Sequence, residues 1–435
     1  MTSPSVQQAD AIVVGAGPAG SSAAAYLAGF GLDVVLLEKT SFPRDKVCGD
    51  GLTPRAVKEL ITLGVSTEDP GWMRSRGLRL IGGGHRVEID WPESSIYPNY
   101  GLARARNDFD YLLARHAVAR GARLVQRANV SGPIRDEATG RLRGVQVKVM
   151  DERGRPTGET TEYHAPFTLA CDGNSSRLSL AMDRPRREDR PMGVGVRTYF
   201  KTPRSTDDYM ESWMELWTPS DPQDPSSKPV LLPGYGWIFA LSDGTSNVGL
   251  GILDTSPSFR SVDCKEVLRR WVDTLPAEWT FTPENMTSPI RGAALPMALN
   301  RRPLYRDGLF LLGDAGGMIS PFNGEGIAHA MEAARIAAQT ISGALDQPDQ
   351  RARERVAATY PGAVEDELGG YFMLGAQFAR IIGHPEIMRL AVRHGLPRRT
   401  LMRFVVKIMA GLAEPSGGGL DDRVIAALTR VTPSA

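Results

Sequence analysis

The sequence predicts a mixed α/β fold in which a Rossmann-like nucleotide-binding domain is interleaved with an antiparallel β-sheet domain and followed by a C-terminal helical region. Three observations support this fold class. Residues 10–39 contain two apolar, strand-like stretches separated by a glycine triplet and an alanine-rich helix. Period-two alternation, typical of half-buried antiparallel strands, appears at residues 86–91 and again between 193 and 253. Residues 346–435 carry apolar stretches of helical length, separated by breaks that contain proline.

The opening unit carries the glycine spacing of dinucleotide-binding proteins. Gly15, Gly17 and Gly20 follow an apolar strand in G-x-G-x-x-G spacing, and the next strand ends at Glu38. Gly15 permits a tight turn, Gly17 lets a pyrophosphate approach the backbone, and Gly20 lets the helix pack closely on the strand. The positive end of the helix dipole faces the phosphates, and Glu38 is placed to accept hydrogen bonds from a ribose. The stretch therefore predicts a dinucleotide site.

The three patterns divide the chain into three parts. We expect the nucleotide-binding domain at residues 1–77, 101–185 and 291–345, the antiparallel-sheet substrate domain at 78–100 and 186–290, and the helical region at 346–435. Residues 101–123 are expected to form a helix, and residues 220–229 a polar loop. Gly249 and Gly251 share one face of a predicted strand, which indicates close approach of a ligand or another strand. A glycine fingerprint that opens a chain interleaved in this way is more typical of FAD than of NAD.

Composition argues against several other function classes. The 51 basic and 50 acidic residues give a formal charge of +1, without the basic surplus that nucleic-acid binding needs. Three scattered cysteines and six histidines show no disulfide or metal-ligand spacing, so we expect no metal and a reducing cytoplasm. Apolar runs stay below the roughly 18 residues needed to span a bilayer. We therefore expect a cytoplasmic protein, with peripheral contact at the inner face of the membrane left open.

The loop after Glu38 contains basic residues, a cysteine and glycines: Lys39, Lys46, Cys48 and Gly49. One interpretation is an exposed connection with solvated charges. The other is a loop folded back over the cofactor, in which glycine lets the backbone approach a flat ring. We favour the second, because the loop directly follows the strand expected to bind the ribose.

Four stretches of the chain resemble the FAD-dependent geranylgeranyl reductase family, within the wider flavoprotein group that includes p-hydroxybenzoate hydroxylase. They are GAGPAG with Glu38, FPRDKVCGDGL at 42–52, the R-x-x-F-D of 106–110, and GDAGGMISPFNGEGIAHAMEAA at 313–334. The lysine-x-cysteine-glycine loop and the YGWIF stretch at 235–239 are typical of the reductase branch. The match also resembles bacterial members proposed to saturate menaquinone side chains.

The resemblance implies FAD as cofactor and a set of site residues. The implied cofactor-binding residues are Gly15, Gly17, Ala19, Gly20, Glu38, Lys39, Lys46, Cys48, Gly49, Arg106, Asp172, Gly173, Gly313, Asp314, Gly324, Gly326 and Ile327. Residues 324–327 would begin a helix whose positive end faces the flavin pyrimidine carbonyls. The catalytic candidates are Cys48, Tyr235 and Trp237, and packing alone is the alternative role for each.

The implied activity is saturation of C=C bonds in an isoprenoid chain, as geranylgeranyl diphosphate, menaquinone or another prenyl lipid. An isolated alkene has no carbonyl to stabilise negative charge, so flavin hydride must be accompanied by a proton, and the protein must provide an acid. Cys48, Tyr235 and a flavin-bound water are the candidates. No second glycine fingerprint is present, so electrons come from transiently docked NADPH or from a donor protein such as reduced ferredoxin.

Two alternatives stay open. One is an FAD-dependent monooxygenase or halogenase of the same fold, although residues 235–240 read YGWIFA where halogenases carry W-x-W-x-I-P. The other is a flavin electron carrier to quinone. Such carriers usually add an iron–sulfur cluster, for which three scattered cysteines are too few.

Overall fold

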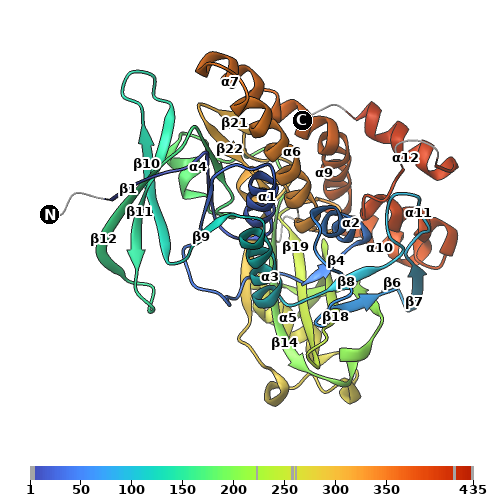
Figure 1. The fold of residues 1–435 in the computed structure, drawn as a ribbon. Coiled ribbons are helices and arrows are strands. Elements are labelled where there is room, and N and C mark those ends of the chain that lie inside the picture. Colours follow the sequence, from blue (N-terminus) through green and yellow to red (C-terminus); the bar gives the residue numbers. More distant parts are fainter. Residues whose placement is uncertain (1–4, 222–223, 256–258, 260–261, 415–417, 433–435) are drawn as a thin grey trace.

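A six-stranded, mostly parallel sheet forms the centre of the nucleotide-binding part (Figure 1). This computed structural model describes residues 5–221, 224–255, 259, 262–414 and 418–432. The sheet order is β21 (Tyr305–Arg306), β22 (Leu309–Leu311), β13 (Phe167–Ala170), β2 (Ala11–Val14), β3 (Val34–Leu37), β9 (Arg123–Val125). β2, β3 and β13 are buried throughout, which explains their continuous apolar sequences.

Three helices pack together beside this sheet: α1 (Pro18–Gly29), α3 (Arg106–Ala119) and α6 (Ile327–Leu345). α1 packs between the other two, and its small residues allow close contact (Figure 1). α2 (Pro54–Leu63) packs on α6. The parallel βαβ unit expected from residues 10–39 is therefore present.

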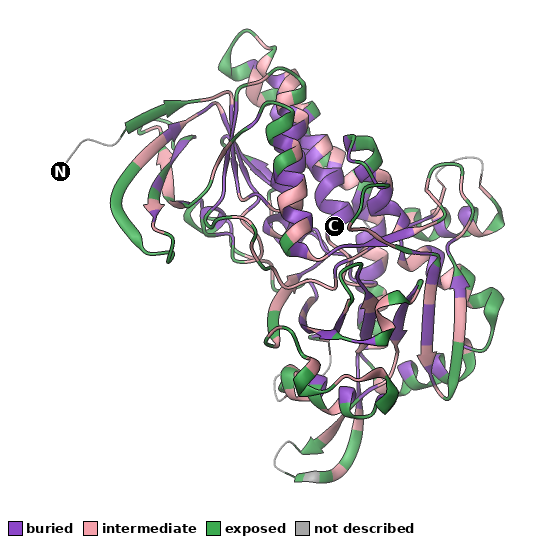
Figure 2. Cartoon of the chain, turned by 60° about the horizontal axis from the view of Figure 1, so that its bottom comes forward, coloured by how far each residue is buried: buried purple, intermediate pink, exposed green. Residues whose placement is uncertain are grey.

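A second, four-stranded sheet extends from this part: β1 (Ser5–Gln8), β12 (Pro156–His164), β11 (Leu142–Met150) and β10 (Ala128–Arg135). β12 was not predicted, because its sequence PTGETTEYH has no apolar alternation and most of it is exposed. Figure 2 shows that buried residues concentrate in the central sheet and its helices, whereas the outer strands of this smaller sheet carry exposed residues.

The antiparallel part is a seven-stranded sheet. Its order is β20 (Arg291–Pro296), β14 (Met192–Lys201), β19 (Thr245–Leu253), β18 (Gly234–Ala240), β15 (Tyr209–Trp213), β6 (Gly77–Gly82), β7 (His85–Asp90). Only the β15–β6 pair within it is parallel. β20 pairs with β14, so the sheet continues past residue 290. α5 (Cys264–Asp273) packs on β14 and β19.

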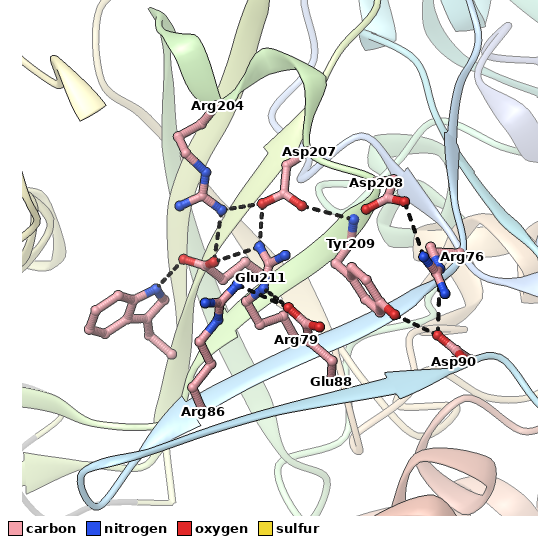
Figure 3. A network of polar contacts seen from close by, with 11 residues as sticks. Arg76, Arg79, Arg86, Glu88, Asp90, Arg204, Asp207, Asp208, Tyr209 and Glu211 are labelled. Carbon is pink, nitrogen blue, oxygen red and sulfur yellow. Dashed lines mark hydrogen bonds and ion pairs between the residues drawn. The ribbon is translucent and has the colours of Figure 1, made fainter. Parts of the chain in front are cut away.

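The face of this sheet that points away from the cavity described below carries a buried ion-pair network (Figure 3). Arg79 on β6 and Arg204 both donate to the Glu211 carboxylate on β15, at 3.0 and 2.8 Å. Asp207 accepts from both arginines, and Trp213 Nε1 donates to Glu211 at 2.7 Å. The network ties β6 to β15 and so fixes the opposite face, from which Met210 points into the cavity.

Two local predictions were wrong. Residues 101–123 do not form one helix: β8 (Gly101–Ala103) precedes α3 and pairs with β4 (Gly51–Leu52) and β5 (Met73–Ser75). The polar stretch 220–229 belongs instead to a hairpin of β16 (Leu216–Asp221) and β17 (Asp224–Leu232), with residues 222–223 outside the described part. Tertiary pairing partners overrode the local polarity in both segments.

The C-terminal region is helical: α7 (Gln350–Ala357), α8 (Tyr360–Val364), η6 (Glu365–Gly369), α9 (Gly370–Ile382), α10 (Pro385–Leu390), η7 (Ala391–Gly395), α11 (Arg399–Met409) and α12 (Leu420–Val431). α11 packs beside β7, so these helices reach from the nucleotide-binding part to the seven-stranded sheet (Figure 1). Among the described residues, no helix has the length and apolar character needed to cross a membrane.

Candidate active site: a cofactor cradle and an apolar cavity

The three glycines of the opening turn occupy different environments. Gly15 has φ +100°, and a Cβ on it would lie 2.8 Å from the carbonyl carbon of Cys171. A Cβ on Gly20 would overlap the carbonyl oxygen of Gly15, so Gly20 packs against the turn itself. Around Gly17, the nearest atoms to such a Cβ are guanidinium nitrogens of Arg106 and Arg44, each 4.0 Å away. Gly17 therefore faces open space that two cations border.

Glu38 is buried at the end of β3, beside this turn. Its Oε2 accepts the Ala16 backbone N–H at 3.1 Å, and its Oε1 accepts the Thr40 backbone N–H at 3.0 Å. Arg44 donates to Glu38 at 3.2 Å and to Asp110 at 2.8 Å. These contacts hold the carboxylate in one place at the carboxyl end of the strand, where a ribose of a bound dinucleotide would meet it.

Arg106 is anchored by a carboxylate one helical turn further along α3. Its Nε and a terminal nitrogen donate to the two oxygens of Asp110 at 2.6 and 2.9 Å. Asp110 is fully buried and also holds Arg44, so one carboxylate positions both guanidinium groups beside Gly17. Arg44 and Asp110 both lie in motifs that were quoted from the sequence, but neither was among the predicted site residues.

The loop around Cys48 folds back against the aromatic face of β18. Rings of Trp237 and Phe239 would lie 3.4 Å from a Cβ on Gly49, so the loop backbone packs closely on both rings. Asn247 Nδ2 donates to the Cys48 carbonyl oxygen at 2.8 Å, and Asn247 Oδ1 accepts from Trp237 Nε1 at 2.8 Å. Asn247 thereby links the loop to the aromatic strand.

Asp50 is the second residue of this loop that sequence reasoning missed. It is buried at φ +65°, and its carboxylate accepts Asn247 Nδ2 at 2.7 Å, the Tyr199 hydroxyl at 2.8 Å and the Arg106 backbone N–H at 3.2 Å. Burial raises the pKa of its carboxyl to about 6, although the hydrogen bonds from Asn247 and Tyr199 lower the pKa in part. At neutral pH the group is therefore ionised and holds three structural donors.

The glycine face of β19 accommodates a side chain of the neighbouring strand. A Cβ on Gly249 would overlap the Trp237 ring, and a Cβ on Gly251 would lie 3.7 Å from the same ring. The sequence left open whether a ligand or another strand approaches this glycine face. The structure shows that the indole of Trp237, from the neighbouring strand, packs against it. Asn247 lies on this face, so the glycine pattern was the signal that pointed to it.

The other walls come from the ends of β13 and β22 and from the loop before α6. Asp172 and Gly173 follow β13, and Asp314 follows β22. Burial raises the pKa of Asp172, whose Oδ1 is buried and lacks a hydrogen-bond partner among the described residues. Tyr235 donates its hydroxyl hydrogen to the Asn323 carbonyl oxygen at 2.6 Å. The tyrosine thus links β18 to the loop that begins α6.

These elements enclose one cavity of about 840 Å³. Every site residue expected from the sequence except Gly20 lines it. The open face of Gly17, the fixed Glu38 carboxylate and the unpartnered Asp172 oxygen fit an FAD molecule lying along the carboxyl ends of the strands.

The same cavity continues into an apolar branch. The branch lies between the seven-stranded sheet and the C-terminal helices, and its walls include Leu80, Met210, Ile382, Val392, Val405 and Met409. Sheet side chains alternate along β15, so Met210 faces the branch whereas Glu211 and Trp213 line a separate hollow on the opposite face. The cofactor cradle therefore opens into a space with the chemistry of a hydrocarbon chain.

Fold and site together define an FAD-dependent oxidoreductase. The chain belongs to the FAD binding domain family, whose model matches residues 8–360. It is 34% identical over 404 residues to the menaquinone reductase of Mycobacterium tuberculosis (strain H37Rv), covering 93% of this chain and 91% of that protein. It is 27% identical over 390 residues to digeranylgeranylglycerophospholipid reductase 1 of Methanopyrus kandleri, covering 87% and 91%.

Solved structures share the fold. A geranylgeranyl bacteriochlorophyll reductase-like protein from Thermoplasma acidophilum superposes with a TM-score of 0.75 at 19% identity, covering 97% of this chain and 100% of that one. The flavin-dependent brominase Bmp2 superposes with a TM-score of 0.70 at 19% identity, covering 98% of each chain. At this identity the structures establish the architecture, which reductases and halogenases share.

Proposed function

We propose that the protein saturates C=C bonds of an isoprenoid chain, with the side chain of menaquinone as its first substrate. The observation that carries the proposal is the apolar branch that leads out of the cofactor cradle. The menaquinone and digeranylgeranylglycerophospholipid reductases named above supply the substrate class, because both named lipids contain isoprenoid units. Bound FAD supplies hydride when it is reduced.

The chain's own residues hold, orient and shield the reactants in this proposal. Glu38 accepts from the ribose, and Gly17 with Arg106 and Arg44 receives the pyrophosphate. The Cys48–Gly49 loop, held by Asn247, lies along the flavin ring. The remaining expected cofactor-binding residues, except Gly20, line the same cradle. The C-terminal helices cover the apolar branch and exclude water from it.

We further propose that the protein works peripherally at the inner face of a membrane. Exposed Ile387, Leu390 and Leu401, with Leu390 62% exposed, lie on α10 and α11. Five arginines are also exposed from α10 through α11: Arg389, Arg393, Arg398, Arg399 and Arg403. We call these eight residues the docking face. The same helices also line the apolar branch, with Leu401 of the docking face among the lining residues, so an anionic bilayer bound there would deliver a prenyl lipid directly.

Vesicle sedimentation tests the docking face. The double variant Arg398→Glu with Arg399→Glu should lose binding to phosphatidylglycerol vesicles, while reduction of a detergent-dispersed lipid persists. Arg115→Glu with Arg120→Glu is the matched control, because both arginines are exposed, one on α3 and the other at its C-cap. Binding that is unchanged by the charge reversal would contradict the proposal. Loss of electron transfer from a donor protein, with vesicle binding intact, would assign the face to that donor instead.

The activity itself is tested under anaerobic conditions. Holoprotein reduced with dithionite is mixed with menaquinone or with geranylgeranyl diphosphate, and the lipid is analysed by mass spectrometry. An isoprenoid chain that gains one H₂ per saturated bond supports the reductase. Comparing the extent of saturation of the two lipids shows which head group the protein prefers. Flavin reoxidised by quinone without a change in the side chain supports an electron carrier. Reoxidation only after air is admitted supports a monooxygenase or halogenase. NADPH and reduced ferredoxin, our two proposed donors, replace dithionite in a second series.

A further inference from the structure

Glu325 is a buried carboxyl in the wall of the cavity. It follows Gly324, which has φ +74°, and lies two residues before α6, whose N-cap is Gly326. Its Oε1 accepts the Thr53 hydroxyl hydrogen at 2.6 Å, whereas Oε2 is buried and has no hydrogen-bond partner within the described chain. A buried polar atom without a protein partner is rare, and in the wall of a cavity it is free to pair with a ligand or a reacting group. Glu325 lines the same cavity as Cys48 and Tyr235 of the cofactor cradle and Ile382 of the apolar branch.

The charges around Glu325 leave it without a counter-ion of its own. Arg55 on α2 donates to both oxygens of Glu332 on α6, at 2.7 and 3.1 Å. Although burial opposes ionisation there, Arg55 holds the pKa of Glu332 down to about 2, so this pair is neutral as a unit. His329 on α6 contacts Glu332 through Nδ1 at 3.2 Å.

The other titratable groups that face Glu325 are Tyr235 on β18 and Tyr371 on α9. Burial raises the pKa of Glu325, opposed by His329, the Thr53 hydrogen bond and Arg55, so a proton is retained more readily than on a surface carboxyl. The earlier candidates are poorer acids, because burial raises the pKa of both the Cys48 thiol and the Tyr235 hydroxyl. Tyr235 also already donates its hydrogen to Asn323.

We propose that Glu325 is the acid that protonates the alkene. The inference rests on the proposed function. The proton leaves Oε2 for one alkene carbon, and the π electron pair forms that new C–H bond. The other carbon receives a hydride with its electron pair from the two-electron donor, the reduced flavin. Glu325 is left as a carboxylate, with Thr53 still donating to Oε1, and regains a proton from water after the product leaves.

Single-turnover kinetics with Glu325→Gln test this role. We expect the lipid-dependent reoxidation of reduced holoprotein to slow by about 10²-fold or more, the usual contribution of a general acid. Reduction of the flavin by its donor and binding of the lipid should stay unchanged. The wild-type rate should fall as rising pH ionises the carboxyl, and the variant should lose this dependence. Glu325→Asp, which keeps the acid one methylene shorter, should recover part of the rate.

Glu59→Gln is the matched control. Glu59 is also buried on α2, with a pKa that burial raises and an unpartnered Oε1, but it does not line the cavity. Its variant should reoxidise at the wild-type rate. The infrared band of a protonated carboxyl, recorded on resting protein, should weaken in Glu325→Gln, which is a readout independent of turnover.

Two results would overturn the assignment. One is wild-type saturation kinetics in Glu325→Gln, and the other is an infrared spectrum that shows Glu325 ionised at neutral pH. Wild-type protein that fails to saturate any isoprenoid chain would instead refute the proposed function. The two failures are therefore distinguishable.

Discussion

Two glycines of the opening turn should respond in opposite ways to the same added methyl group. In Gly20→Ala, the new Cβ would overlap the Gly15 carbonyl oxygen and lie 3.0 Å from its carbon and 3.1 Å from Val13 Cγ1. α1 must then move away from β2, an overpacking that costs about 1–3 kcal/mol. Better helix propensity of alanine offsets up to about 1 kcal/mol of that cost. The net loss in apoprotein stability should be about 1–2 kcal/mol.

In Gly17→Ala, the methyl group meets no atom closer than 4.0 Å, so the free energy of unfolding of the apoprotein should stay within about 1 kcal/mol of the wild-type value. The methyl instead occupies the space in which the pyrophosphate approaches the backbone. FAD affinity should fall by about tenfold or more, which is about 1.4 kcal/mol. Urea unfolding of both apoproteins and FAD titration by fluorescence measure the two effects. Equal destabilisation by both substitutions, or unchanged FAD affinity in Gly17→Ala, would refute this division of roles.

Three further substitutions probe the supports of the cavity. The pKa of Asp50 is raised from 3.8 to about 6, so the folded state binds the proton of this carboxyl more tightly than the unfolded state does. This proton contributes about 3 kcal/mol to the free energy of unfolding below pH 3.8, and the contribution should be lost as pH rises through 6. The free energy of unfolding in urea should depend less on pH across this range in Asp50→Asn than in wild type. An equal pH dependence in both proteins would contradict this role of Asp50. Asn247→Leu should lower the free energy of unfolding by about 2–4 kcal/mol, because Trp237 Nε1 loses its acceptor and the Cys48 carbonyl loses its donor. A smaller loss in chemical unfolding would show that water replaces the two hydrogen bonds. Glu211→Gln should lower the free energy of unfolding by about 3 kcal/mol, because buried Arg79 loses one of its carboxylate partners (Figure 3). FAD affinity should stay unchanged, and weaker FAD binding would show that the network influences the cradle.

The glycine turn and the parallel strands could be predicted from the sequence because their signals are local. Gly15, Gly17 and Glu38 lie within one βαβ unit, whose apolar strands and small-residue helix are legible at short range. The strand β12 was missed because its polar side chains give no alternation, and its pairing with β11 and β1 decides its conformation.

The supports of the site depend on contacts between distant segments. Asn247 meets Asp50 across 197 residues, and Glu325 meets Thr53 across 272 residues. Neither pairing leaves a pattern in one stretch of sequence: the glycine face of β19 points to Asn247 but not to its partner Asp50, and Thr53 gives no sign of Glu325. The resemblance to known reductases identified the motifs around them, but only the fold shows which polar atoms are paired and which face the cavity unpaired.

The most direct test of the account is anaerobic single turnover of reduced holoprotein with menaquinone, for wild type and for Val405→Trp. Val405 is partly exposed and lines the apolar branch, so an indole at this position fills the space meant for the chain while the cofactor cradle stays intact. We predict one added H₂ per saturated side-chain bond in wild type, and none in the variant despite a normal flavin spectrum. Equal saturation by both proteins, or flavin reoxidation without saturation in wild type, would contradict the assignment of the apolar branch to an isoprenoid chain.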